Sequence, residues 1–337
     1  MASKPLAPVR VVIATPAARG SGSGNRVTAL RWALWLRRLG AQVRIVEAWQ
    51  GQQCDLLVAV HAIKEARSVL AAAAALPRLR VAVLLAGTDI YPHFAPDADT
   101  AAALARADAV IALQRHGADS MPDDIRRKVR TIVQSAAVVP GQHKAAVFQA
   151  CVLAHLRPVK DPLLPLLALH HVPKDVPLTL VLAGRALTPE LGWEVTAAVN
   201  ADSRARWLGE LPRRAARELL AQSHLCVVPS MAEGGANVVS ESIAAGTPVL
   251  ATAIPGNMGL LGDSWPGLFP PGDRAALGAL LARAATDTAF YQSLLAATLA
   301  LQPLVDPRHE MEAWRQLLAD LGLPAQQRAP DLLTKSS

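Results

Sequence analysis

Residues 229–252 read PSMAEGGANVVSESIAAGTPVLAT, a segment in which an apolar run is followed by a pair of glycines and then by a helical pattern. We predict that a strand ends at Pro229 and that a helix begins near Asn237. Glu233 then lies on the loop and Glu241 about one turn inside the helix, with seven residues between them. This spacing predicts that both carboxylates face one ligand on the side of the helix N-terminus.

The first turn of this helix is a predicted diphosphate site. Backbone N–H groups at a helix start lack partners within the helix, and the helix dipole is positive there. Glu241 is placed to accept hydrogen bonds from a ribose, so the ligand class is a nucleotide sugar. The alternative, two ordinary carboxylates on a loop and a helix, is the default for a bare two-acid spacing. The donor-binding N–H groups are expected from Gly234, Gly235, Ala236, Asn237 and Val238.

A basic segment, AHLRPVKDP at residues 154–162, follows another predicted strand. Arg157 and Lys160 emerge from its end, where ligands of open parallel sheets bind. When a nucleoside diphosphate departs, negative charge develops on its β-phosphate, and fixed cations stabilise that transition state more than the ground state. We therefore predict catalytic roles for Lys160, Arg157 and Glu233. An exposed Arg157 without such a role is the alternative.

The remaining sequence alternates short apolar strands with amphipathic helices, and the alternation restarts after VVPGQHKA. This pattern predicts an α/β protein with two Rossmann-like parallel-sheet domains. We expect an N-terminal acceptor domain over residues 1–140, a nucleotide-sugar domain over 141–304, a crossing helix over 305–325 and a frayed tail over 326–337. Pro140 and Gly141 form the predicted hinge, with the ligand in the cleft beneath it.

The N-terminal half carries a glycine-rich turn, TPAARGSGSGNRVTALRWA at residues 15–33. Its glycines lie in a long loop and lack the spacing of the dinucleotide fingerprint, so Glu47 is not expected to bind a ribose. Backbone N–H groups of such a turn favour a phosphate, although a loop without a ligand is the alternative. The predicted acceptor or phosphate contacts are Gly20, Gly22, Gly24, Asn25, Arg26, Lys64, Thr88, Asp89, Gln134 and Ser135, and His61 is predicted to be catalytic.

Residues 229–252, with the turn AAGTPV, resemble the nucleotide-sugar motif of retaining, family 4-like GT-B glycosyltransferases. That family more often has an arginine five residues before the lysine, where this chain has His155, so Arg157 is the expected substitute. The resemblance implies two Rossmann-like domains facing a cleft, a C-terminal helix packing back on the N-terminal domain, and a UDP-sugar donor. It also implies donor contacts from Arg185 and from Leu208 and Leu211 of the segment LGEL.

The N-terminal half further resembles the selenosugar synthases of bacterial selenoneine biosynthesis, through residues 15–40, DLLVAVHAIKEARS, AGTDIY and residues 112–136. This resemblance implies transfer of a hexosyl group from UDP-N-acetylglucosamine or UDP-glucose to selenophosphate. The products would be a 1-selenosugar, UDP and phosphate. A selenium nucleophile arrives deprotonated, so it needs anion binding near C1 rather than a base.

Composition excludes several other classes. The chain has 337 residues, is 52% hydrophobic and carries a formal net charge of +7, which suits anionic ligands. Its basic residues are scattered and only 4% of residues are aromatic, so no nucleic-acid partner is expected. No apolar run suits a membrane span or signal peptide, which predicts a cytoplasmic protein without stable membrane insertion. No Asp-x-Asp occurs at a predicted strand end and the histidines and cysteines form no cluster, so no metal or other cofactor is expected.

Two other functions remain open at this stage. A glycosyltransferase acting on a lipid or another hydroxyl acceptor would use the same donor site and dock on a membrane through a basic, apolar helix. Trp32 and Trp35 lie with three arginines on one predicted helix, although tryptophans at this spacing are more often core residues. The third possibility is a non-catalytic protein that binds a UDP-sugar.

Overall fold

The computed structural model describes residues 7–91, 94–137 and 144–323, and the chain divides into two compact units. The first unit consists of residues Met1–Leu113, Gly117–Ile132 and Arg308–Ser337, and the second of Gln114–His116 and Val133–Pro307. The predicted hinge at Pro140 and Gly141 and the predicted tail over 326–337 lie outside the described residues. Within the described residues, no helix combines the length and the apolarity that crossing a membrane requires.

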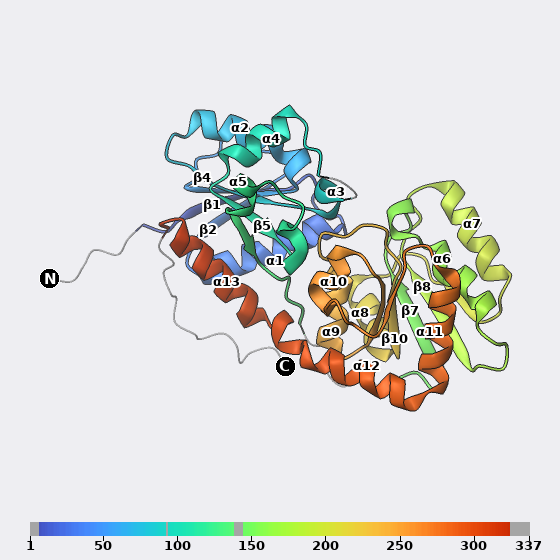
Figure 1. Cartoon of the computed structure of the whole chain (residues 1–337). Helices are drawn as coiled ribbons and strands as arrows, with labels where there is room; N and C mark the ends of the chain where they lie inside the picture. Colours follow the sequence, from blue (N-terminus) through green and yellow to red (C-terminus); the bar gives the residue numbers. More distant parts are fainter. Residues whose placement is uncertain (1–6, 92–93, 138–143, 324–337) are drawn as a thin grey trace. The chain divides into compact units, whose positions relative to one another are not determined.

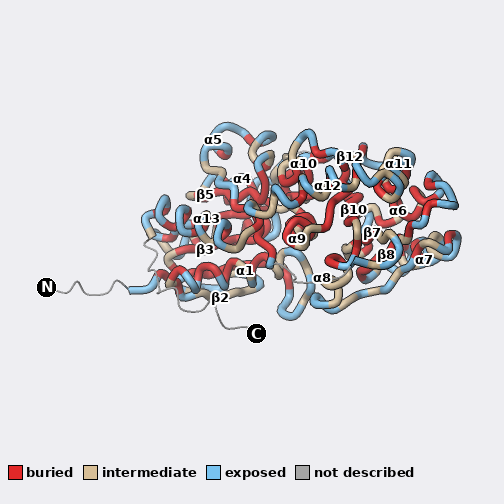
Figure 2. The backbone as a smooth tube through the Cα atoms, turned by 90° about the horizontal axis from the view of Figure 1, so that it is seen from below, coloured by how far each residue is buried: buried red, intermediate tan, exposed pale blue. Residues whose placement is uncertain are grey.

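The first unit contains a six-stranded sheet in the order β2-β1-β3-β4-β5-β6, with every neighbouring pair parallel (Figure 1). Its central strand β3 is buried over its whole length, as expected where helices cover both faces. Figure 2 shows this buried centre of the unit. The strands are β1 Arg10–Ala14, β2 Gln42–Val46, β3 Leu56–Val60, β4 Arg80–Leu84, β5 Ala109–Ala112 and β6 Val129–Thr131.

Two separate layers of apolar side chains cover this sheet. One layer packs α1 and α13 against one face, and the other packs α2 and α4 against the opposite face. Successive side chains of β1 alternate between the two layers. Val11 and Ile13 belong to the first layer, and Val12 and Ala14 belong to the second. The helices are α1 Gly24–Arg38, α2 Ala62–Ala75, α3 Gly87–Ile90, α4 Ala98–Arg106, α5 Asp123–Arg126 and α13 Pro307–Asp320, and η1 spans Arg115–Ala118.

Helix α13 joins the first unit through a buried carboxylate. Glu310 is fully buried and accepts hydrogen bonds from the indole N–H groups of Trp32 and Trp35, each at 2.9 Å, with Arg31 Nε at 3.1 Å. Trp314 meets Trp32 edge to face at 4.9 Å. The prediction that the C-terminal helix packs on the N-terminal domain is confirmed. Both tryptophans belong to the core, as their spacing favoured, and not to a membrane-docking patch.

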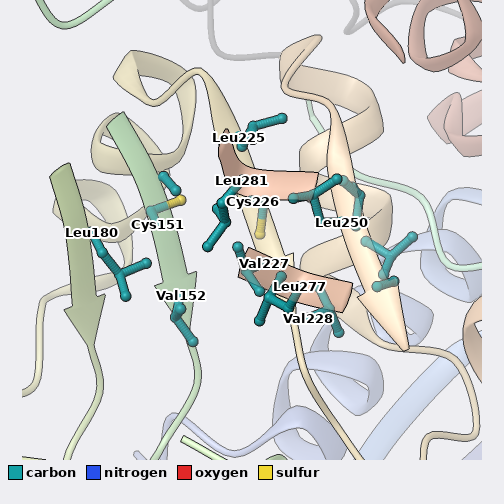
Figure 3. Close-up of a cluster of buried hydrophobic side chains, with 14 of the residues drawn as sticks. Cys151, Val152, Leu180, Leu225, Cys226, Val227, Val228, Leu250, Leu277 and Leu281 are labelled. Atoms are coloured by element: carbon teal, nitrogen blue, oxygen red, sulfur yellow. The ribbon is translucent and has the colours of Figure 1, made fainter. Parts of the chain in front are cut away.

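The second unit contains another six-stranded sheet, in the order β12-β11-β10-β7-β8-β9, again with parallel neighbours (Figure 1). Figure 3 shows Cys151 and Cys226 on neighbouring strands of its core, under Leu277 and Leu281 of α11. Both cysteines are buried and form no disulfide. The strands are β7 Phe148–Leu153, β8 Leu178–Ala183, β9 Ala205–Trp207, β10 Leu225–Val228, β11 Val249–Thr252 and β12 Leu268–Phe269.

Local sequence signals begin and end the helices of this unit. Thr188 caps α7 by accepting from Leu191 N, and a proline occupies the first helical position, whose N–H needs no partner. Gly246 ends α9 at a φ of 65°, a conformation that glycine adopts without steric cost. The helices are α6 Leu163–Ala168, α7 Pro189–Asn200, α8 Arg213–Gln222, α9 Asn237–Ala245, α10 Pro255–Leu261, α11 Arg274–Thr286 and α12 Thr288–Ala300, and the short 3-10 turns are η2 Pro158–Lys160, η3 Leu169–His171 and η4 Gln302–Val305.

Candidate active site

The loop between β10 and α9 has the predicted form. Strand β10 ends at Val228, directly before Pro229, and α9 begins at Asn237. Gly235 adopts a φ of 155°, and Ala236 occupies the N-cap position without a side-chain cap. An apolar N-cap leaves the N–H groups of the first turn to other acceptors, which is the condition for an anion site. Glu241 is the fifth residue of α9, one turn from its start.

Lys160 and Glu233 form an ion pair at the carboxyl edge of the second sheet. Lys160 ends η2, just after β7, and Glu233 lies on the loop after the neighbouring strand β10. The lysine Nζ donates to the glutamate Oε1, and the two side chains are 17% and 9% exposed. The backbone joins the same two loops, because Met231 N donates to Val159 O at 2.8 Å. Two predicted catalytic residues are therefore in direct contact.

A network of backbone and polar contacts supports the Glu233 loop from β11 and α10. Thr252 Oγ1 donates to Ser230 O at 2.6 Å, and Asn257 Nδ2 donates to Thr252 Oγ1 at 3.0 Å. Gly256 packs so closely that an added Cβ would lie 1.9 Å from Glu233 O. These supporting residues were not predicted, because TAIPGN carries no motif of its own and its role depends on which strands are neighbours.

The predicted nucleoside contacts lie at the same strand ends of the second sheet. Glu241 is partly buried, with Arg213 at 3.7 Å, and Leu208 is 48% exposed after β9. Leu211 is half-buried. Arg185 is exposed after β8 and lies 3.8 Å from Glu210.

Arg157 is exposed at the start of η2 and is not within the Lys160–Glu233 pair. His155, which stands where the resembling family more often has arginine, uses its Nδ1 to accept from Arg185 N at 3.3 Å. His155 therefore joins the loops after β7 and β8. A cationic role for Arg157 stays a prediction.

In the first unit, His61 and Asp89 are adjacent at the ends of the neighbouring strands β3 and β4. Both residues are buried, and His61 Nδ1 lies 2.7 Å from Asp89 Oδ1. Asp89 also accepts three backbone N–H groups, so its carboxylate stabilises the two loops, and its contact with a ligand stays a prediction. Lys64 is exposed one turn into α2, and the side chain of Thr88 lies outside the described part of the chain.

The glycine-rich turn leads into α1 as predicted. Ser23 caps the helix by accepting from Arg26 N at 3.4 Å, Gly20 has a φ of 86°, and Gly22 and Gly24 are exposed. Asn25 lies half-buried in the first turn of α1. Arg26 Nε is buried without a hydrogen-bond partner among the described residues, which favours an anionic ligand here.

Three other residues have structural contacts or a place in the fold that the sequence did not indicate. Glu47 accepts from Arg19 N at 3.2 Å, so it stabilises the glycine-rich turn. Gln134 and Ser135 are buried but belong to the second unit, where the adjacent Ala136 N donates to Val305 O at 3.1 Å. Across residues 7–91, 94–137 and 144–323, no group of three or more His, Cys, Asp or Glu side chains is arranged to hold a metal ion.

Comparison with known proteins agrees with this architecture. The family model for glycosyl transferases group 1 matches residues 141–297. The chain is therefore similar to that family over most of its second unit, and its two Rossmann-like sheets form a GT-B fold. No curated protein matches the sequence.

Solved glycosyltransferase structures share this fold at low sequence identity. HepE from Anabaena in complex with UDP-glucose is similar with a TM-score of 0.72 and 18% identity, covering 93% of this chain and 98% of that one. Sucrose-phosphate synthase from Thermosynechococcus elongatus has a TM-score of 0.75 and 16% identity, covering 94% and 99%. A glycosyltransferase from Rickettsia africae has a TM-score of 0.74 and 12% identity, covering 93% and 98%.

Proposed function

We propose that this protein is a UDP-sugar-dependent glycosyltransferase. The observation that carries the proposal is the largely buried Lys160–Glu233 pair, which lies on the loop side of α9, a helix without a side-chain cap, within the segment that matches group 1 glycosyl transferases. HepE binds UDP-glucose, and the structurally similar pneumococcal O-GlcNAc transferase GtfA binds UDP and GlcNAc. These ligands support a UDP-sugar donor for the present chain.

The donor chemistry follows from charge placement. In the proposed complex, the diphosphate lies against the first turn of α9, and Lys160 approaches a β-phosphate oxygen. Breaking the C1–O bond leaves negative charge on UDP, which a fixed cation in a largely buried position stabilises strongly. Glu241 accepts hydrogen bonds from the ribose hydroxyls. Glu233 holds the lysine in place before the donor binds.

The proposed acceptor is selenophosphate, and the proposed pathway is selenoneine biosynthesis. The selenium attacks C1 of the sugar as the C1–O bond to UDP breaks, which forms a C–Se bond. Water then cleaves the Se–P bond, so that phosphate leaves and a 1-selenosugar remains. The support for this acceptor is the resemblance of the N-terminal segments, together with the buried, unpartnered Arg26 Nε at the start of α1. The hexosyl group is N-acetylglucosaminyl or glucosyl.

A lipid or other hydroxyl acceptor is the alternative for the same donor site. The expected docking surface of such an enzyme included Trp32 and Trp35, but both residues are buried against Glu310. The structure thus removes the observation that favoured a membrane acceptor. The third possibility, a protein that binds a UDP-sugar without turnover, is distinguished by measuring UDP release.

We further propose that the transfer requires no metal ion, since Lys160 and the helix N-terminus supply the positive charge at the diphosphate. Treating the protein with EDTA and removing the chelate is expected to leave the rate of UDP release unchanged. Restoration of a lost rate by Mg²⁺ or Mn²⁺ would contradict this assignment.

The testing experiment is anaerobic incubation of the purified protein with UDP-N-acetylglucosamine or UDP-glucose, with and without selenophosphate. UDP release is followed, and the sugar product is identified by mass spectrometry. We expect UDP release that depends on selenophosphate and a sugar containing selenium. Donor binding without turnover would keep the donor site and overturn the acceptor, whereas absence of donor binding would overturn the glycosyltransferase assignment.

A further inference from the structure

The turn that follows Lys160 contains an aspartate in a left-handed conformation. Asp161 has a φ of 41° and a ψ of 57°, and it ends the 3-10 turn η2. Among the residues that the structure describes, two non-glycine residues have a positive φ, Asp161 and His61. A side chain makes this conformation less favourable, and the following Pro162 also biases Asp161 toward an extended backbone. The surrounding structure therefore holds Asp161 in this turn.

Backbone hydrogen bonds fix the chain on both sides of Asp161. Before it, Lys160 N donates to Arg157 O at 2.9 Å, and Asp161 N donates to Pro158 O at 3.0 Å. After it, Leu164 N donates to Asp161 O at 3.2 Å, within the first turn of α6. A single left-handed residue therefore joins η2, which carries Lys160, to the start of α6.

The two elements that meet at Asp161 differ in how firmly they are anchored. In α6, Leu164 and Leu166 are each 3% exposed and Ala168 is fully buried, and all three belong to the core of the second unit. None of the three residues of η2 is buried. A change of the backbone angles at Asp161 reorients the two elements relative to each other, and a close-packed helix resists displacement more than an exposed turn. The turn that carries Lys160 is therefore the part that would move.

Lys160 is sensitive to such a movement because its side chain makes a specific contact. Its Nζ donates to Glu233 Oε1 on the neighbouring loop, and 17% of the lysine side chain is exposed. We infer that Asp161 is a positioning residue for Lys160, and that its left-handed backbone places the ammonium group beside Glu233. The catalytic consequence rests on the proposed function, in which this ammonium group stabilises the leaving diphosphate. Asp161 thus acts through Lys160.

The carboxylate of Asp161 has a separate role in stability. Asp161 is half-buried, and burial raises the pKa of its carboxyl, whereas a hydrogen bond from Leu164 N and the charge of Arg274 act in the opposite direction. These contacts stabilise the start of α6. Substitution can separate the two roles: glycine removes the carboxylate and adopts the left-handed backbone freely, whereas valine removes the carboxylate and strongly disfavours that backbone.

The position of the lysine is testable without any activity. The folded proteins are treated briefly with acetic anhydride, and acetylation of Lys160 is measured by peptide mass spectrometry relative to Lys174, whose side chain is 75% exposed. We expect Asp161→Val to raise the acetylation rate of Lys160 several-fold, toward that of Lys174, because the lysine leaves Glu233 and becomes exposed. Asp161→Gly is expected to keep the wild-type rate. A wild-type rate in Asp161→Val would overturn the inference.

Activity provides the second readout. We expect Asp161→Val to lower kcat by about 10- to 100-fold with little change in the KM for the donor, because a displaced cation no longer stabilises the transition state. Asp161→Gly is expected to retain kcat even where loss of the carboxylate lowers its Tm. In the Lys160→Ala background, Asp161→Val is expected to cause no further loss of kcat, since it acts through the lysine. Equal losses in the valine and glycine variants, or a further loss in that background, would overturn the positioning role.

Asp287→Val is the matched control for lost stability. Asp287 caps α12 by accepting from Phe290 N at 3.0 Å, and its φ of −102° suits valine. We expect this change to lower the Tm of the second unit and to leave kcat unchanged. If Asp161→Val does not fold, Asp161→Ala replaces it, because alanine also disfavours a positive φ. We then expect faster acetylation of Lys160 and a lower kcat in the alanine variant than in Asp161→Gly, and equal values would overturn the inference.

The two readouts separate the inference from the function on which it rests. Faster acetylation of Lys160 in Asp161→Val, in a protein that does not use UDP-sugars, would retain the positioning role and overturn the proposed function. A functional transferase in which Asp161→Val changes neither the acetylation of Lys160 nor kcat would retain the function and overturn the positioning role.

Discussion

At the scale of single residues, Glu65 illustrates a buried acid that the proposed reaction does not use. It lies in the first turn of α2, is 2% exposed and has a carboxylate oxygen, Oε2, without a hydrogen-bond partner in the described part of the chain. Burial raises the pKa of Glu65 to about 7, and a hydrogen bond from Ser68 acts in the opposite direction. The group is therefore neutral in the folded protein at weakly acidic pH.

A raised folded-state pKa means that the folded state binds the proton more tightly than the unfolded state. Protonation of Glu65 therefore stabilises the folded state. This contribution to the free energy of unfolding is complete below the ordinary glutamate pKa of 4.5 and is lost as pH rises through about 7. We expect Glu65→Gln to raise the free energy of unfolding by roughly 2 kcal/mol at pH 8 and to change it little at pH 4.5. Urea denaturation across this range measures the effect, with exposed Glu194→Gln as control. An equal effect at both pH values would contradict the raised pKa.

The Lys160–Glu233 pair yields a prediction about catalysis. We expect Lys160→Ala to lower kcat by about 100- to 1,000-fold, because the cation stabilises the leaving diphosphate chiefly in the transition state. Glu241→Ala is expected to raise the KM for the donor instead, because ribose contacts are made equally in both states. Steady-state kinetics separates the two effects. Lys174→Ala, which removes an exposed lysine paired with the buried Asp202, is the control. A wild-type rate in folded Lys160→Ala would refute its role.

The sequence placed side chains together where short segments fix their positions. The motif around Glu233 is continuous, and its contact with Lys160 follows from parallel strand ends meeting at one edge. The structural contacts of Asp89 could not be predicted, because its partners come from another strand end and from the backbone. The burial of Glu65 was equally unpredictable, because one glutamate in a polar helical pattern gives no signal of what covers it.

At the scale of elements, the approach of α10 to the loop after β10 determines where Glu233 lies. Gly256, in α10, leaves no room for a side chain against Glu233 O. We expect Gly256→Ala to displace the loop, lower kcat/KM by at least about 10-fold and destabilise the second unit by about 1 to 3 kcal/mol. Kinetics and thermal unfolding measure both effects. Gly192→Ala is the control, since its Cβ would stay 3.3 Å from any neighbour. An unchanged kcat/KM would show that the loop tolerates the shift.

Long periodic elements were predicted closely from the sequence. Helix α9 begins at Asn237, as expected from its helical pattern and the preceding pair of glycines. The short elements α3, α5 and η2 were not predicted, because three or four residues contain no complete period. Their positions depend on contacts with loops that are distant in sequence.

At the scale of the whole molecule, the sequence predicted two Rossmann-like domains, and the GT-B fold is confirmed. The last helix returns to the first unit, so this unit is built from both ends of the chain. The sequence indicated this only through the resemblance, because the amphipathic pattern of α13 shows that one face is buried but not against which partner.

Substitution of the buried Glu310 tests whether this residue anchors α13 to the first unit. We expect Glu310→Ala to destabilise the first unit by about 3 to 5 kcal/mol, because two indole N–H groups and Arg31 lose their shared acceptor. Chemical denaturation followed by tryptophan fluorescence measures this loss. Glu312→Ala, on the exposed side of the same helix, is expected to have little effect. Equal effects of the two changes would refute the anchoring role of Glu310.

The attachment of α13 to the first unit also fixes an order of events during synthesis. The ribosome makes the first sheet before the second unit, but α13, which covers one face of that sheet, emerges only after the second unit. The second unit, whose sheet and helices lie between residues 133 and 307, therefore has all its parts before the first unit does. The unit whose sheet is translated first completes its folding last, and its apolar face needs protection from aggregation until α13 has been made.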